Sequence, residues 1–271
     1  MSQKKKTSFT RPELTTEELS LALYKVTREL DEANSLLRKN QQQKDLLFAN
    51  ISHDLRSPIT AIRNSIEYLL SLENPEKEEV SSTLQLIKRR SIYLENLIND
   101  VFLLSSIGVN DSLFHMETIN LTFLLEDFYF TTLEDSIYEE RELSLEVSQD
   151  LNAPVTVDTK MLIRVLDNLF TNALKYSYPG AKIALGAFLE KNFVHVYVKD
   201  TGIGIEAKLL EKIFDVSYMA ESARTPSNTT GTGLGLSIAK AVITQLQGHI
   251  WCESTPKAGS TFHFTLPLVK L

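Results

Sequence analysis

A long run of helix-forming residues with a regular apolar pattern dominates the first part of the chain. From Glu13 to Ile107 only Pro58 and Pro75 interrupt this run. Apolar residues recur there at alternating spacings of four and three, which is the heptad pattern of helices that pack side by side. The first set is Leu19, Leu23, Val26, Leu30, Ala33 and Leu37, and the second is Phe48, Ile51, Leu55, Ile59, Ile62, Ile66 and Leu69.

A turn divides this helical region in two. Glu73-Asn74-Pro75-Glu76 has the polar residues and the proline of a turn that leads into a new helix. The apolar residues of the second helix are Val80, Leu84, Ile87, Leu94, Ile98 and Val101. Two amphipathic helices joined by a short loop cannot bury their apolar faces alone. We therefore expect two chains to pair their hairpins in a four-helix bundle, so that the protein is a homodimer.

Beyond the linker Gly108–Ser112 the pattern changes to short strands mixed with helices. The alternation of apolar and polar residues predicts strands over Leu143–Val147, Lys182–Leu189, Phe193–Lys199, His249–Ser254 and Ser260–Leu266. Helical periodicity predicts helices over Leu121–Tyr138, Thr159–Tyr176 and Leu236–Leu246. This mixture favours an α+β layer in which helices pack on one face of a sheet.

Composition excludes several classes of protein. With 271 residues, 43% hydrophobic and 23% charged, the chain is typical of a globular protein with two domains. The net charge of −7 argues against nucleic acid as a partner. No apolar run is long enough to cross a bilayer, and no apolar segment follows the first lysines as in a secretory signal. The single cysteine, Cys252, fits a reducing compartment, so we expect a cytoplasmic location.

The segment from Phe48 to Pro58 contains the first group of chemically informative residues. His53 lies about 200° around the helix from Ile51 and from Leu55, so it should face water when they face inward. Imidazole is largely neutral near pH 7 and offers a ring nitrogen as a nucleophile. Asp54 can accept the proton of the other ring nitrogen and fix the tautomer. Pro58, inside the helix, should free a backbone carbonyl near His53 and bend the helix.

A second group of polar residues lies on the helix that begins at Thr159. Asn168 and Asn172 are four residues apart and share one side of that helix, with Lys175 close by. Amide oxygens suit a magnesium ion that keeps most of its waters and binds phosphates. Lys175 can add a positive charge for a phosphate, and Tyr176 a ring that packs on a base. Two asparagines alone could equally be solvated residues of a surface helix.

Two glycine-containing loops complete the pattern. Asp200 ends a predicted strand and can accept a hydrogen bond from an exocyclic amine, which would select adenine. Gly202 and Gly204 follow it and let a ligand approach the backbone closely. Further on, Gly231-Thr232-Gly233-Leu234-Gly235 precedes a helix, whose N-terminal N–H groups suit a phosphate. These glycines come late, without a preceding βαβ unit, which argues against a dinucleotide fold.

Together these segments resemble the sensor histidine kinases of two-component systems, over roughly residues 44–269. His53-Asp54-Leu55-Arg56-Ser57-Pro58 is similar to the phosphoacceptor box of that family, and the segment Asp167–Tyr176 to its N box. The two glycine-containing loops are similar to its two glycine boxes. Four boxes in the family's order are far more specific than any one of them.

The resemblance implies a fold, an activity and a set of roles. The fold is a dimeric helical hairpin followed by the left-handed β-α-β ATP sandwich shared with type II topoisomerases and mismatch-repair ATPases. The activity is ATP-dependent phosphorylation of His53, followed by transfer of the phosphoryl group to an aspartate of a response regulator. Asn172 would carry Mg²⁺, Asn168 and Lys175 would support the phosphates, Tyr176 would pack on adenine, and Asp200 would bind its amine. The other implied nucleotide-binding residues are Gly202, Gly204, Gly231, Gly233, Leu234 and Gly235.

Two positions depart from the family's pattern. After Ile213-Phe214 this chain has Ser217-Tyr218-Met219 where the family usually has an aromatic and a basic residue. Arg224, in the segment Glu221–Thr230, is the candidate replacement for that basic residue. Four residues after His53 the family commonly has threonine or asparagine, and this chain has Ser57. Because the resemblance gives that residue the role of positioning a water, we expect Ser57 to support weak phosphatase activity toward the regulator.

The resemblance also divides the chain and leaves two alternatives. We expect a tail (1–12), a coiled-coil signalling helix (13–43), a dimerisation and phosphotransfer domain (44–107), a linker (108–114) and an ATP-binding catalytic domain (115–271). An upstream sensor protein or domain would act on the signalling helix. One alternative is an ATP-binding regulatory module without kinase activity, and the other is an ATPase that clamps on closure. Intact His53, Asp54, Asn172 and Asp200 argue against the first alternative, and an exposed histidine on a dimerising hairpin argues against the second. The remaining histidines (His115, His195, His249 and His263) show no metal-ligand spacing, so we interpret them as structural.

Overall fold

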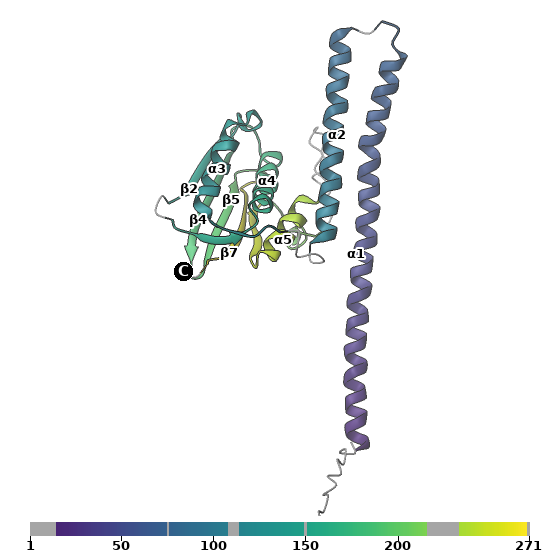
Figure 1. Cartoon of the computed structure of the whole chain (residues 1–271), viewed down its shortest axis with the longest axis vertical. Coiled ribbons are helices and arrows are strands. Elements are labelled where there is room, and N and C mark those ends of the chain that lie inside the picture. Colours follow the sequence, from purple (N-terminus) through teal and green to yellow (C-terminus); the bar gives the residue numbers. More distant parts are fainter. Residues whose placement is uncertain (1–14, 75, 108–113, 149–150, 216–232, 270–271) are drawn as a thin grey trace, which may run out of the picture. The chain divides into compact units, whose positions relative to one another are not determined.

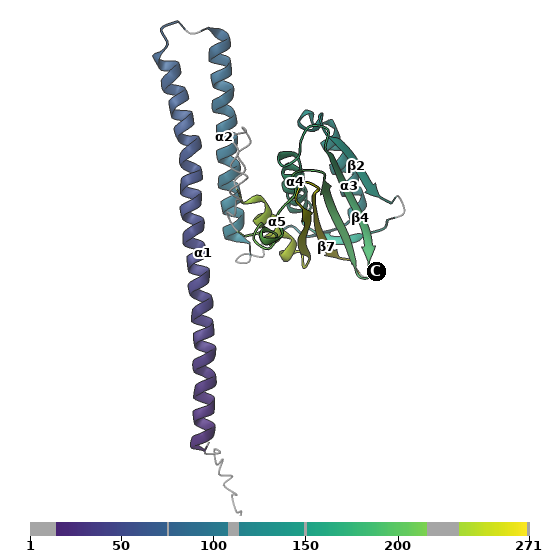
Figure 2. The ribbon, with the colours of Figure 1, turned by 180° about the vertical axis from the view of Figure 1, so that it is seen from behind.

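The computed structural model describes residues 15–74, 76–107, 114–148, 151–215 and 233–269, and the chain divides after Ala49 into two compact units. Helix α1 (Thr16–Ser71) is followed by helix α2 (Lys77–Ser106). Within the second unit, the part of α1 from Asn50 onward runs alongside α2 in the opposite direction (Figures 1 and 2). The predicted hairpin is thus confirmed. Pro58 does not end α1, which continues through it.

Both helices leave apolar side chains uncovered in the single chain. In the first unit, the heptad residues Leu23, Val26, Leu30 and Leu37 are between 59% and 69% exposed. In the hairpin only a few side chains are buried, among them Ile51 and Leu97. Exposed apolar surface of this extent is a feature of protein interaction sites. None of the described helices is long and apolar enough to cross a membrane.

In the described part of the chain beyond α2, the elements are a five-stranded sheet, a two-stranded sheet, three α-helices and short 3-10 helices. The small sheet pairs β1 (Glu117–Asn120) with β3 (Pro154–Val157) antiparallel. The large sheet has the order β2-β4-β5-β7-β6, with β2 and β4 parallel and the other neighbours antiparallel. Its strands are β2 (Glu142–Val147), β4 (Lys182–Glu190), β5 (Phe193–Asp200), β6 (His249–Thr255) and β7 (Gly259–Pro267). All five predicted strands are confirmed, whereas β1 and β3 were not predicted.

Helices α3 (Leu121–Glu134), α4 (Thr159–Lys175) and α5 (Gly235–Gln245) cover one face of the large sheet (Figures 1 and 2). The alternation along β5 explains this arrangement. Val194, Val196 and Val198 point toward the helices and are at most 1% exposed. The resulting core confirms the predicted layer of helices on a sheet, with α4 at its centre.

The third helix is shorter than predicted. We expected it to run from Leu121 to Tyr138, but α3 ends at Glu134 and a 3-10 turn, η2 (Ser136–Tyr138), follows. Asp135 has extended backbone angles, and its carboxylate accepts a hydrogen bond from Ile137 N at 3.1 Å. A short acidic side chain that binds the backbone locally competes with helix, which accounts for the difference.

Histidines and aromatic rings gather on the open face of the sheet. Cross-strand register places His195 on β5 next to His263 on β7, with 3.0 Å between Nε2 and Nδ1. The ring of Trp251 stacks on His263 and on His249. His195 is only 7% exposed, and Nδ1 of His195 and Nε2 of His263 are buried without a hydrogen-bond partner. The described residues contain no group of three or more metal-ligating side chains. That the two imidazoles are structural stays a prediction.

This pair predicts a pH-dependent stability. Burial and the neighbouring His195 lower the pKa of His263. The unfolded chain therefore takes up a proton before the folded chain as the pH falls below about 6.5, and the unfolding free energy decreases with falling pH. In His263→Phe this decrease should be smaller, by at most about 1.4 kcal/mol per pH unit. Urea unfolding between pH 7.5 and 5, followed by the fluorescence of Trp251, the single tryptophan, measures it.

The matched control is His249→Phe, because His249 also stacks on Trp251 but is exposed. This variant should show the pH dependence of the unchanged protein. A His263→Phe variant with the same pH dependence as the unchanged protein would contradict the interpretation.

Candidate functional site

His53 projects into solvent from α1. Its side chain is 81% exposed, and Nδ1 lies 3.3 Å from Oδ1 of Asp54. Asp54 is more covered, with a side chain that is 30% exposed. The carboxylate can hold a proton on Nδ1, which leaves the lone pair of Nε2 free toward solvent. This arrangement provides an oriented nucleophile without burial of the imidazole.

Ser57 and Pro58 follow His53 on the same helix. Ser57 is exposed and lies one turn after His53, so its hydroxyl is on nearly the same side of α1. Pro58 is buried, and its ring cannot donate to the carbonyl of Asp54 as an ordinary residue would. The sequence placed both residues correctly beside His53.

Helix α4 carries the candidate phosphate-binding residues. The carboxylate of Asp158 caps its N-terminus, with Oδ1 3.1 Å from Met161 N. Leu162, Val165, Leu166 and Leu169 are fully buried, so the direction of the polar side chains is fixed. Asn168, Asn172 and Lys175 lie on the part of the helix that is not fully buried, as expected.

The side chain of Asn168 is close to the second glycine box. A β-carbon added at Gly235 would lie 2.8 Å from Oδ1 of Asn168, so glycine permits this close approach. Gly235 is also the first residue of α5, whose N-terminus favours negative charge. The structure therefore brings together two segments that are distant in the sequence. Nδ2 of Asn168 is buried and has no hydrogen-bond partner among the described residues.

The structure describes only some of the other residues of the second glycine box. Gly233 has a φ of +68°, which glycine adopts without strain. Leu234 is 1% exposed, so its side chain belongs to the core. Gly231 lies outside the described residues, as do Ser217–Met219 and Arg224.

Asp200 is held rigidly at the end of β5. It is 5% exposed, and its Oδ1 accepts hydrogen bonds from Gly202 N at 2.8 Å and Ser260 N at 3.2 Å. Burial raises the pKa of Asp200, and the two backbone donors oppose this shift. With Oδ1 occupied, Oδ2 is the oxygen that can accept a hydrogen bond from a ligand amine.

The first glycine box packs against the end of α4. Tyr176, the C-cap of that helix, accepts a hydrogen bond at its carbonyl from Ile203 N at 2.9 Å. A β-carbon at Gly202 would lie 2.2 Å from the same carbonyl oxygen, so only glycine fits there. Lys175 Nζ is 4.9 Å from the centre of the Tyr176 ring. Asp200, Gly202, Lys175 and Tyr176 are thus brought together as the sequence predicted.

Two residues of this arrangement were missed by sequence reasoning. Gly259 has a φ of +101°, and a β-carbon there would lie 2.0 Å from the carbonyl oxygen of Asp200. The neighbouring Ser260 supplies the second donor to Asp200. The turn Pro256-Lys257-Ala258-Gly259 was the available signal, since such a turn returns the next strand to the preceding one.

The residues present fit a nucleotide with its Mg²⁺. The unpaired Nδ2 of Asn168 and the N-terminus of α5 can bind phosphate oxygens, and the amide oxygen of Asn172 is a ligand type that Mg²⁺ accepts. Tyr176 lies about two helical turns beyond Asn168 at the end of α4, and Gly202 brings Asp200, at the end of β5, close to it, so a base can bind there.

Comparisons with known proteins agree with this arrangement. Residues 43–109 match the family model "His Kinase A (phospho-acceptor) domain". Residues 157–270 match the family model "Histidine kinase-, DNA gyrase B-, and HSP90-like ATPase". The first match contains His53, and the second contains all of the predicted nucleotide-binding residues.

Curated relatives and solved structures extend these matches. The chain is 34% identical to sensor histidine kinase WalK of Bacillus subtilis, over 84% of this chain and 37% of the relative. It is 31% identical to sensor protein VanSC of Enterococcus gallinarum, over 80% of this chain and 59% of the relative. The chain thus spans between about a third and three fifths of these proteins. A crystal structure of histidine kinase ThkA in complex with response regulator protein TrrA has the same fold, with a TM-score of 0.64. The match covers 92% of this chain and 67% of that chain, with 24% sequence identity.

The two matched domains follow one another in this chain, with His53 in the first and the asparagines and the two glycine-containing loops in the second, and the matched curated relatives are sensor histidine kinases. The chain therefore belongs to the sensor histidine kinases of two-component systems.

Proposed function

We propose that this chain is a protein histidine kinase that uses ATP to phosphorylate its own His53 and then passes the phosphoryl group to an aspartate of a response regulator. The observation that carries this proposal is that one chain combines an exposed histidine beside a carboxylate with polar residues around α4 that are suited to bind a nucleotide. A regulatory module without kinase activity would not require His53 and Asp54 in this geometry.

The phosphorylation step begins at Nε2 of His53. Asp54 holds the proton on Nδ1, so the Nε2 lone pair can attack the terminal phosphorus of ATP. A bond forms between Nε2 and phosphorus, the bond to the bridging oxygen breaks, and ADP leaves with the electron pair. In the second step a carboxylate oxygen of the regulator attacks the same phosphorus, and the phosphorus–nitrogen bond breaks.

The residues around α4 bind and orient the nucleotide. Oδ2 of Asp200 accepts a hydrogen bond from the adenine amine, and Tyr176 packs on the base. Lys175 and the N–H groups at the start of α5 attract the phosphates. When bound, Mg²⁺ would be held by Asn172 and would neutralise charge that develops on the phosphates. Positioning and charge stabilisation are most of what phosphoryl transfer requires of a protein.

Three partners follow from this proposal. The exposed heptad residues of α1 and the uncovered apolar residues of the hairpin support a homodimer that buries them. A response regulator is the phosphoryl acceptor, by analogy with the complex named for ThkA. An upstream sensor protein or domain would act on α1.

The assignment of His53 predicts the outcome of its replacement. His53→Gln should abolish acid-labile labelling from γ-labelled ATP, because no nucleophilic nitrogen remains, while the affinity for ATP is unchanged. Filter-bound label and calorimetry of ATP binding measure the two properties. His249→Gln, also an exposed histidine, is the control and should label normally. Acid-labile label that persists in His53→Gln would show that another residue is the acceptor.

The assignment of Asn172 predicts a change in magnesium dependence. Asn172→Asp should weaken Mg²⁺-dependent ATP binding by roughly tenfold or more, because a carboxylate repels phosphate and changes the ligand geometry. Calorimetric titration with ATP, with and without Mg²⁺, measures the effect. Asn192→Asp, an exposed residue in the turn between β4 and β5, is the control. Equal ATP affinities in Asn172→Asp and the unchanged protein would contradict the assignment.

The position of Ser57 predicts a weak phosphatase activity. The hydroxyl of Ser57 can orient a water toward a docked phosphoaspartate, but serine lacks the methyl group with which threonine restricts its rotamer. Ser57→Ala should slow the loss of label from phosphorylated regulator, and Ser57→Thr should accelerate it, both with ADP and Mg²⁺ present. Autophosphorylation of His53 serves as the internal control and should be nearly unchanged. Dephosphorylation by Ser57→Ala at the normal rate would exclude this role.

A further inference from the structure

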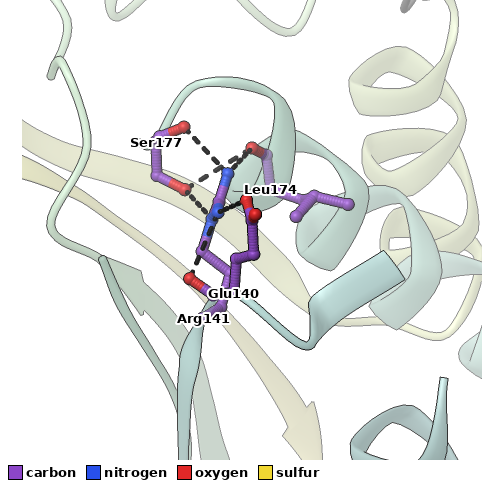
Figure 3. Close-up of polar contacts among 4 residues, drawn as sticks. All are labelled: Glu140, Arg141, Leu174 and Ser177. Atoms are coloured by element: carbon purple, nitrogen blue, oxygen red, sulfur yellow. Dashed lines mark hydrogen bonds and ion pairs between the residues drawn. The ribbon is translucent and has the colours of Figure 1, made fainter. Parts of the chain in front are cut away.

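Arg141, which directly precedes β2, binds the end of helix α4 (Figure 3). Nη2 donates to the carbonyl oxygens of Leu174 at 3.4 Å and Ser177 at 3.2 Å. Nε donates to Oγ of Ser177 at 3.1 Å, and Nη1 donates to the carbonyl oxygen of Glu140 at 3.3 Å. A single guanidinium group thus connects the start of an edge strand to the last turn of α4 and to Ser177, two residues after the end of that helix.

The charge of Arg141 is balanced mainly by the backbone. Its side chain is only 9% exposed, yet the nearest carboxylate, that of Glu140, is 4.0 Å away and 74% exposed. Because the Glu140 carboxylate is largely in water and lies at the limit of ion-pair distance, this pair contributes little. The carbonyls at the C-terminus of a helix carry partial negative charge, and α4 presents them to this cation. The site is therefore built around the end of α4.

The two residues whose carbonyl groups bind Nη2 of Arg141, Leu174 and Ser177, lie on either side of residues proposed to bind the nucleotide. Lys175 and Tyr176 lie between Leu174 and Ser177 in the chain. The carbonyl of Tyr176 in turn receives the N–H of Ile203 from the first glycine box. Gly202 approaches that carbonyl so closely that a β-carbon would lie 2.2 Å away. A shift of the segment 174–177 would therefore move the loop that follows Asp200.

We propose that Arg141 is a positioning residue of the nucleotide site, which fixes Tyr176 and the first glycine box for the base of ATP. This inference rests on the proposed function for the identity of the nucleotide. Arg141 acts through the backbone of residues 174–177 and does not itself contact the ligand. Its planar group with several donors is suited to this task, because it reaches four acceptors at once, whereas a lysine ammonium is a single point of charge.

Three variants separate the effects of the positive charge of Arg141, of its planar shape and of its position in the fold. Arg141→Gln removes the charge and most donors, and Arg141→Lys keeps the charge without the planar group. Lys182→Gln is the matched control, because Lys182 pairs with Glu142 on the adjacent strands but both side chains are at least 65% exposed.

The first measurement is amide hydrogen exchange of the nucleotide-free protein. Exchange of the Ile203 amide should accelerate roughly tenfold or more in Arg141→Gln and less in Arg141→Lys. In both variants the amide of Val196, in the centre of the sheet, should exchange at the rate of the unchanged protein. In Lys182→Gln all amides should exchange at that rate. Two results would overturn the proposal. One is normal protection of Ile203, and the other is an equal acceleration at Ile203 and Val196, which would indicate general destabilisation.

The second measurement is labelling of His53 as a function of ATP concentration in the presence of Mg²⁺. The half-saturating ATP concentration should rise about tenfold in Arg141→Gln, with the maximal rate changed by less than about twofold, and Arg141→Lys should recover part of the loss. An unchanged half-saturating concentration would overturn the proposal. If the unchanged protein neither binds ATP nor labels His53, the proposed function fails instead, and hydrogen exchange still decides whether Arg141 positions Ile203.

Discussion

The apolar face of α4 is the constraint on which the candidate nucleotide site depends. Leu162, Val165, Leu166 and Leu169 have no exposed surface, so the rotation of the helix about its axis is fixed by packing against the sheet. Because successive helical residues differ by about 100°, this rotation also determines where Asn168 and Asn172 point. The buried leucines thus determine the geometry of the polar residues that would bind the ligand.

Both glycine boxes pack against α4. Gly202 rests on the carbonyl of Tyr176, and Gly235 lies against the side chain of Asn168. Eight residues separate these two contact points along the helix, which corresponds to about 12 Å at a rise of 1.5 Å per residue. A base and a chain of phosphates can therefore be bound at two different positions along one rigid element. Arg141 secures the end of that element where the base would bind.

Local pattern was enough to predict some features and not others. The long apolar periodicity of α4 and the alternation along β5 predicted both elements to within one residue, because burial on one face determines the pattern. Strands β1 and β3 have four residues each, too few for a distinct alternation. The His195–His263 pair depends on the register between β5 and β7, and the bonds from Arg141 to Ser177 join residues 36 apart in the chain. Such contacts are set by tertiary packing, which local sequence does not contain.

The proposed nucleotide site and the proposed phosphoacceptor require opposite degrees of burial. Asp200 must distinguish one ligand amine, so a buried carboxylate held by two backbone N–H groups is suitable, since nothing must reorganise when the ligand binds. His53 must meet two different partners in turn, first ATP and then the carboxylate of a regulator. A buried imidazole could reach neither, whereas a side chain that is 81% exposed is accessible to both. An exposed imidazole has few neighbours that fix its orientation. The contact of its Nδ1 with Asp54 on the same helix orients the ring and leaves Nε2 accessible. Local orientation by a neighbouring carboxylate therefore lets one exposed atom serve both transfers.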